Sequence, residues 1–257
     1  MFRALRIAIL LAILLVVGVG TWQAKARIAD WDVPLRVAVY PIAGDDGPTT
    51  RSYVASLTTA TYEPIERYVA EEARRYEVRT SFGDPLRIRL APPVDELPPP
   101  PPRDADVLKI MLWSLKLRWW AWRVDTHDGL EPDVQLFVVY HDPERSDVLE
   151  HSLGLEKGRI GIVNAFASNA MAEMNNVVIA HELLHTLGAS DKYDARTNLP
   201  LFPDGYARPD LQPRHPQKFA EIMAGRIPIS EAEATMAPSL DATLIGEATA
   251  REINWTK

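Results

Sequence analysis

Two histidines and a glutamate occur at a spacing that could hold a metal ion and activate a water molecule. His181 and His185 are four residues apart, with Glu182 directly after the first, in the run HELLHTLGASD. On a helix, residues four apart project from one face, so both imidazoles can reach the same ion. Glu182 lies about 100° round the helix, where it can hold a water in the open position of the metal. The run therefore predicts a catalytic metal centre with Glu182 as general base.

A third ligand has to come from residues beyond this helix. Gly188 falls at the expected helix end, where a left-handed glycine lets the chain reverse sharply. The reversal can bring Asp191 back toward the imidazoles as a carboxylate ligand, which leaves the fourth position to water. Two other carboxylates compete for the role: Asp194, and Glu221, which lies forty residues after His181.

The extended pattern resembles the metzincin clan of zinc endopeptidases, whose motif HExxHxxGxxH is followed by a methionine turn. Here Asp191 replaces the third histidine, as in the snapalysin-like variant HExxHxxGxxD. The run EIMAG at 221–225 looks like the methionine turn, which in that clan places a methionine, here Met223, beneath the metal. The resemblance implies Zn²⁺ bound by His181, His185 and Asp191, and hydrolysis of a peptide or protein substrate by metal-activated water. A glutamate ligand at position 221 would instead match the gluzincins.

The resemblance, which is specific over residues 176–225, also implies a fold. It predicts an α/β catalytic domain at 28–257, in which a twisted mixed sheet with backing helices forms an upper lobe, residues 28–188. An irregular lower lobe, residues 189–257, closes the cleft that holds the zinc. The strand at 159–166 is expected at the upper rim, where an extended peptide would add by β-augmentation. The substrate-binding residues expected there are Ile160, Gly161, Ile162, Val163 and Asn164.

Two functions of other kinds stand beside the peptidase. A membrane-tethered binding or assembly protein could keep a metal for structure without turnover, and a zinc hydrolase could act on a non-peptide substrate. Glu182 argues against a structural role, because purely structural zinc sites are usually four-coordinate and closed. Tyr193 and Tyr206 are candidate donors to an oxyanion, as tyrosines are in several members of the clan.

The amino-acid composition excludes some classes of binding partner and some kinds of metal ligand. The net charge of −7 over 257 residues gives no diffuse positive field, so we expect no nucleic-acid partner. The sequence has no cysteine, which excludes disulfides and thiolate ligands. The sequence does not predict the oligomeric state.

The first 27 residues carry a targeting pattern. Arg3 and Arg6 precede an almost uncharged apolar stretch at 7–22, which Lys25 and Arg27 follow. This pattern predicts either an uncleaved signal anchor or a cleaved signal peptide. Either form places the remaining chain outside the cytoplasm. We expect a domain anchored in a bacterial inner membrane and facing the periplasm or exterior, or a secreted one after cleavage.

Strands and helices that could position the metal centre alternate along the chain. Hydrophobic patterning predicts strands at 35–40, 86–90, 134–140 and 159–166. It predicts helices at 63–76, 104–121 and 176–187, with a last helix within 241–254. Asn175 or Asn176 is expected to cap the helix that carries the histidines. Residues 91–102 hold seven prolines in twelve and predict a surface loop.

The helix expected at 104–121 carries two stripes at helical spacing. The first is apolar and is expected in the core: Leu108, Met111, Leu112, Leu115, Trp119 and Trp122. The second mixes cations and aromatic residues: Lys109, Trp113, Lys116, Trp120 and Arg123. Such a mixture is typical of a helix that faces a bilayer, or of core tryptophans flanked by extended cations.

Overall fold

A five-stranded mixed sheet forms the centre of the molecule. The computed structural model describes residues 31–102, 106–145, 152–155 and 159–256, so the predicted targeting segment at 1–27 lies outside the described residues. The sheet has the order β2-β1-β3-β5-β4. Its strands are β1 (Leu35–Ala43), β2 (Leu86–Leu90), β3 (Val134–His141), β4 (Leu153–Leu155) and β5 (Ile160–Phe166). Four strands are parallel, and β4 is antiparallel to β5.

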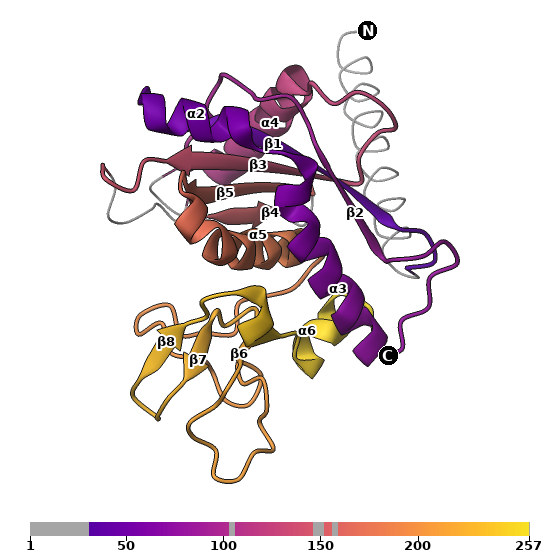
Figure 1. The fold of residues 1–257 in the computed structure, drawn as a ribbon, viewed down its shortest axis with the longest axis vertical. Helices are drawn as coiled ribbons and strands as arrows, with labels where there is room; N and C mark the ends of the chain where they lie inside the picture. The colour runs from indigo at the N-terminus through magenta and orange to yellow at the C-terminus, as the bar shows by residue number, and fades with distance from the viewer. Residues whose placement is uncertain (1–30, 103–105, 146–151, 156–158, 257) are drawn as a thin grey trace, which may run out of the picture.

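Helices cover both faces of this sheet (Figure 1). One face carries α2 (Pro48–Ser56), α3 (Glu63–Arg75) and α5 (Ala172–Thr186), and the other carries α4 (Val107–Val124). Alternation along β1 explains the two cores, because Val37 and Val39 point toward α3 and α5 while Ala38 and Tyr40 point toward α4. The chain is therefore an α/β protein with a mixed sheet, as the sequence predicts.

The chain after α5 forms an irregular segment below that helix in Figure 1. Its short elements are β6 (Ala220–Glu221), β7 (Arg226–Pro228), β8 (Ala234–Met236), η4 (Leu240–Ala242), β9 (Thr243–Leu244) and α6 (Glu247–Glu252). Strand β6 pairs with β9, and β7 pairs with β8. No helix among the described residues is both long and apolar enough to cross a bilayer.

The helix α5 begins earlier than the sequence predicts. A short 3-10 helix, η3 (Asn169–Met171), leads into it, and Met171 occupies the N-cap position. The prediction of Asn175 or Asn176 as the cap is therefore wrong. Both asparagines are buried, and the amide of Asn175 bonds the backbone of Phe166, accepting from its N–H at 3.0 Å and donating to its carbonyl at 2.8 Å. This tertiary pairing ties the end of β5 to the start of α5.

The two faces of α4 are the reverse of those predicted. The side chains of Leu117, Trp120 and Ala121 are buried, and the rings of Trp120 and Phe137 of β3 lie 4.6 Å apart. Trp113 is partly buried and donates to the carbonyl of Pro99 at 2.9 Å. The residues expected in the core are exposed by more than half, and we call them the α4 stripe: Leu108, Met111, Leu112, Leu115, Trp119 and Trp122. Both faces carry large apolar residues at helical spacing, so periodicity alone could not identify the buried one.

Trp120→Ala and Trp122→Ala should therefore differ strongly in stability. Loss of the buried ring should lower the free energy of unfolding by about 3–5 kcal/mol. Loss of the exposed ring, which is 75% accessible, should change it by less than about 0.5 kcal/mol. Chemical denaturation of the two variants beside the wild type measures both effects. Equal destabilisation by the two substitutions would contradict the assignment of faces.

Candidate metal centre

Backbone carbonyl oxygens orient both imidazoles of α5. The Nδ1 atom of His181 lies 3.0 Å from the oxygen of Ile222, and that of His185 lies 2.7 Å from the oxygen of Ala189. A carbonyl oxygen only accepts, so each Nδ1 carries the proton and donates it. This leaves the lone pair of a neutral imidazole on Nε2, which is the arrangement of metal-bound histidines.

Three atoms with lone pairs converge beside the helix. The two Nε2 atoms are 3.0 Å apart, and Oδ1 of Asp191 lies 3.3 Å from Nε2 of His181 and 3.1 Å from Nε2 of His185. Tetrahedral ligands at about 2.0–2.1 Å from one zinc ion would be about 3.3 Å from one another. The donor set and its spacing therefore fit a tetrahedral metal ion with three protein ligands.

The position of Asp191 depends on the turn that ends α5. Gly188 has a φ of 106°, and the N–H of Ala189 donates to the carbonyl of Leu184 at 3.0 Å. This is a Schellman-type helix end, in which only glycine takes the left-handed position without strain. The predicted reversal at Gly188 is confirmed. The same turn supplies the Ala189 carbonyl that orients His185, so one feature positions two ligands.

Glu182 lies beside the ligands and is almost fully buried. His181, Glu182 and His185 form a group that could hold a metal ion, with ligand atoms within 4.8 Å of one another. Asp191 approaches both imidazoles more closely, within 3.3 Å. Of the three candidate carboxylates, Asp191 is the one that the structure brings against both imidazoles.

The pKa values of His181 and Asp191 show that the cluster attracts positive charge. Burial alone would lower the pKa of His181, but the hydrogen bond with Asp191 and the charge of Glu182 outweigh it, and the pKa is raised. Burial alone would raise the pKa of Asp191, but hydrogen bonds with the two imidazoles hold it well below its usual range. Asp191 is therefore ionised at neutral pH, as a metal ligand must be.

The two other candidate ligands are engaged elsewhere. Asp194 accepts from the N–H groups of Arg196 at 2.8 Å and Thr197 at 3.2 Å, and so closes an exposed turn. Glu221 is fully buried, and burial raises the pKa of its carboxyl group. Its side chain accepts from four donors: the N–H groups of Met223, Ala224 and Gly246 and the hydroxyl of Thr249. Its role is structural.

Residues 221–225 form a tight turn under the histidines. The N–H groups of Ala224 and Gly225 both donate to the Glu221 carbonyl at 3.0 Å, and Met223 is fully buried. The carbonyl of Met223 accepts from the N–H of Lys192 at 3.0 Å, next to Asp191. The turn therefore contacts the metal centre twice, since its Ile222 carbonyl also orients His181.

Glu252 at the end of α6 holds the segment that carries Asp191, and sequence reasoning missed it. Its carboxylate accepts from the N–H and hydroxyl of Ser190 at 2.9 and 2.7 Å. It also pairs with the buried ammonium of Lys192 at 2.7 Å, so it bonds the residues on both sides of Asp191. About sixty residues separate Glu252 from these partners, and no local pattern indicates the contact.

The predicted substrate-binding strand is in the interior of the sheet. Over Ile160–Ile162, β5 pairs with β3 on one side and β4 on the other. The side chains of Ile160, Ile162 and Val163 are buried, and Gly161 faces Leu136 and Thr186. Asn164 bonds Nε2 of His141 at 3.0 Å. The prediction that this strand forms the rim of the cleft is therefore wrong, because β4 is the edge strand.

Gly154 brings β4 into contact with α5. A Cβ atom there would lie 2.3 Å from Cβ of His185 and 2.8 Å from the carbonyl oxygen of Glu182. Only glycine permits so close an approach. The edge strand therefore runs directly past the metal ligands. Its three residues are too few to show an alternating pattern, which explains why the sequence did not reveal this strand.

The two candidate tyrosines have different surroundings. Burial and the charges of Asp191 and Glu182 raise the pKa of Tyr193, so its hydroxyl keeps its proton beside the metal centre. The hydroxyl of Tyr206 lies 3.0 Å from Nε2 of His215. Burial and the charge of Glu231 raise its pKa, against the effect of Arg214. Tyr193 is the better placed of the two to act as a donor at this site.

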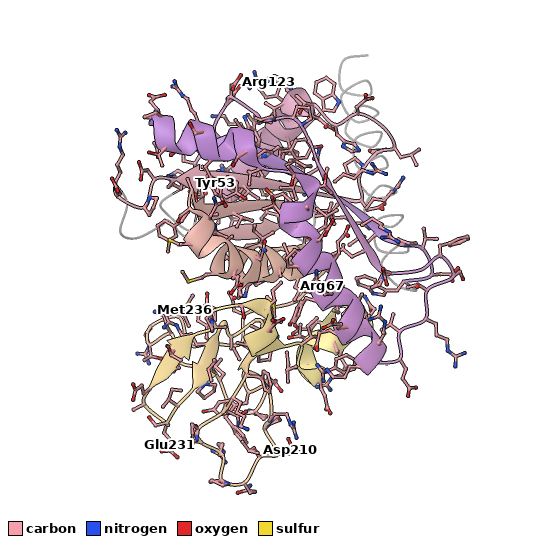
Figure 2. The ribbon with its side chains drawn as sticks, in the orientation of Figure 1. Tyr53, Arg67, Arg123, Asp210, Glu231 and Met236 are labelled. Atoms are coloured by element: carbon pink, nitrogen blue, oxygen red, sulfur yellow. The ribbon has the colours of Figure 1, made fainter. Side chains whose placement is uncertain are left out.

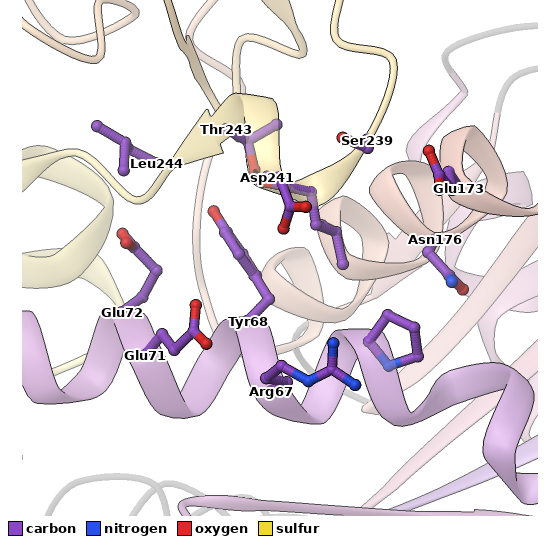
Figure 3. Close-up of a pocket in the computed structure, with 12 residues that line it drawn as sticks. Arg67, Tyr68, Glu71, Glu72, Glu173, Asn176, Ser239, Asp241, Thr243 and Leu244 are labelled. Carbon is purple, nitrogen blue, oxygen red and sulfur yellow. Dashed lines mark hydrogen bonds between the residues drawn. The ribbon is translucent and has the colours of Figure 1, made fainter.

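A cavity of about 330 Å³ lies on another flank of α5. Figure 3 shows Glu173 and Asn176 of α5 facing it, together with Arg67 and Glu71 of α3 and Asp241 of η4. Asn176 precedes His181 by five residues and so lies roughly 140° from it round the helix. None of the residues that line this cavity belongs to the metal centre.

Comparison with known proteins assigns no family. No family model matches the sequence, and no curated protein matches it. Among solved structures, the chain is similar to wild-type OgpA from Akkermansia muciniphila, with 12% identity and a TM-score of 0.35. The match covers 85% of this chain and 59% of the OgpA chain, so the present chain spans less than two thirds of it.

The variants Asp191→Ala and Asp194→Ala test which of these two carboxylates binds the metal. Loss of an outer partner of a ligand already costs about 10–100-fold in metal affinity, so loss of Asp191 should weaken Zn²⁺ binding by more than about 100-fold. Asp194→Ala should stay within about threefold of the wild type, since this carboxylate only closes a turn. Titration with Zn²⁺ against a competing chelator measures both. Asp191→His should restore binding, and the reverse order of the two alanine variants would refute the assignment.

Glu252→Ala tests whether Glu252 holds the segment that carries Asp191 in place. Glu247→Ala is the control from the same helix. Removal of Glu252 leaves the buried Lys192 ammonium without its carboxylate and should destabilise the protein by about 1–3 kcal/mol. It should also weaken Zn²⁺ affinity by about 10–100-fold, because the loop that carries Asp191 loses its attachment. Glu247 is exposed, and its removal should change neither the stability nor the Zn²⁺ affinity. Unchanged Zn²⁺ affinity in a destabilised Glu252→Ala protein would show that Glu252 serves stability alone.

Proposed function

We propose that this protein is a metzincin-like zinc endopeptidase. One observation carries the proposal: Nε2 of His181, Nε2 of His185 and Oδ1 of Asp191 lie within 3.0–3.3 Å of one another, with Glu182 next to them on α5. Three protein ligands and an adjacent carboxylate are the composition of a catalytic zinc site, which keeps its fourth position for water. The buried turn around Met223 supports the assignment to the metzincin clan.

Glu182 is the general base in this proposal. Zinc held by the three ligands would lower the pKa of a bound water toward about 7 and polarise the substrate carbonyl. Glu182 takes the proton of the attacking water and then delivers it to the leaving amine. Its burial beside the ligands keeps the carboxylate oriented and partly shielded from bulk water. Tyr193 is the chain's candidate donor to the oxygen of the attacked carbonyl.

The edge strand β4 is the proposed binding site for an extended peptide. It ends the sheet order, and among the described strands only β5 pairs with it. A peptide backbone could therefore add to its outer edge by β-augmentation. Gly154 holds this edge against Glu182 and His185. A substrate peptide bound along β4 would thus pass directly over the metal ligands, and this role replaces the one expected of residues 160–164.

Glu182→Gln tests the mechanism, because this substitution removes the base and spares the metal ligands. The variant should keep close to one zinc per chain and lose about 10²–10⁴-fold in peptidase activity. Elemental analysis and mass spectrometry of peptide cleavage measure the two quantities. Glu173→Gln, at an exposed position of α5, is the matched control and should keep both. Hydrolysis of esters with no cleavage of any peptide by the zinc-loaded wild type would exclude a peptidase in favour of another zinc hydrolase.

A further inference from the structure

The α4 stripe forms an exposed apolar surface on a helix whose opposite side is buried. Its six members are 56–75% exposed, and Val107 and Ile110 extend the apolar surface at the start of the helix. Leu117, Trp120 and Ala121 attach the other side of α4 to the sheet. Soluble monomers rarely expose contiguous apolar surface on this scale, and where they do it marks an interaction site. Something other than water is expected to cover the stripe.

The charges of α4 indicate what covers it. The helix contains Lys109, Lys116, Arg118 and Arg123 and no acidic residue, although the whole chain has a net charge of −7. Lys109, Lys116 and Arg123 recur every seven residues and therefore form a line along one border of the stripe. The guanidinium of Arg123 also lies 4.9 Å from the centre of the Trp119 ring. Positive charge beside exposed tryptophans is complementary to anionic lipid headgroups above an apolar layer.

We propose that the α4 stripe docks on the surface of an anionic lipid bilayer. The stripe would enter the boundary between headgroups and acyl chains, while Lys109 and Lys116 bind lipid phosphates; Arg123 itself pairs with Glu96. Only three residues, 28–30, separate the targeting segment predicted at 1–27 from Trp31 at the start of the described chain. Trp31 packs against Trp255 in the core on the α5 side of the sheet, so the segment would hold the protein at a membrane but does not by itself turn α4 toward it. Three residues span at most about 11 Å, which keeps the folded part near a membrane that holds the segment.

Docking through α4 would leave the metal centre facing away from the lipid. The sheet lies between α4 and α5, so the two helices occupy opposite faces (Figure 1). Figure 2 shows Arg123 of α4 at the opposite end of the molecule from the C-terminal segment that carries Glu231. The edge of β4 and the metal ligands would thus stay accessible to soluble substrates. The docking proposal does not depend on peptidase activity.

The absence of cysteine allows a direct test with single labelled sites on the full chain. Leu115→Cys places an environment-sensitive fluorophore on the stripe, and Leu201→Cys, at a position 49% exposed in the C-terminal segment, is the matched control. Each protein is reconstituted into vesicles of phosphatidylethanolamine and phosphatidylglycerol. Acrylamide quenches labels in water, and brominated acyl chains quench labels in the bilayer.

The label at position 115 should be shielded from acrylamide by at least fivefold relative to the label at 201, and quenched by the brominated lipids. Lys109→Gln with Lys116→Gln should reduce the shielding at position 115, as should vesicles without phosphatidylglycerol. Free access of acrylamide to position 115 would overturn the proposal. Shielding from both quenchers would also overturn it, because the cover would then be protein, either a second copy or another segment of this chain.

Discussion

The convergence of three lone pairs beside α5 is the constraint on which the rest of the structure depends. Two imidazole nitrogens and a carboxylate oxygen within 3.0–3.3 Å repel one another unless a cation or a proton lies among them. The fold holds them in place from two directions. The turn after Gly188 orients His185 and returns Asp191, and the turn at 221–225 orients His181 through a carbonyl. Because both turns bond through the backbone, the geometry of the centre depends on chain conformation more than on flexible side chains.

Buried charges in the C-terminal segment maintain that conformation. Glu221 is inaccessible to solvent, but its side chain accepts hydrogen bonds from four donors. These hydrogen bonds offset the free-energy cost of burying the carboxyl group. Lys192 and Glu252 form an ion pair in which the ammonium is buried and the carboxylate is partly exposed, and it fixes the residues on both sides of Asp191. Such pairs add little net stability, but an alternative packing would leave them unpaired. Their effect is to exclude other positions of the loop, which is what a preorganised metal ligand requires.

The sheet separates two surfaces with different chemistry. On one face, β4 approaches α5 at Gly154 and forms an edge beside the metal ligands. On the other face, α4 covers the sheet with Trp120 and directs the α4 stripe outward. Binding at one surface therefore need not obstruct binding at the other.

The sequence by itself determined the helix that carries His181, Glu182 and His185, the candidate carboxylate Asp191 and the reversal at Gly188, but it left Asp194 and Glu221 as rivals of Asp191. These features depend on residues within eleven positions of one another, where helical periodicity and the left-handed preference of glycine act locally. Only the tertiary structure decided which face of α4 is buried, which strand forms the sheet edge, and that Glu252 supports Asp191. Each of these depends on contacts between residues far apart in the chain. Local patterning is the same for a stripe that faces a sheet and for one that faces solvent, so only packing could distinguish them.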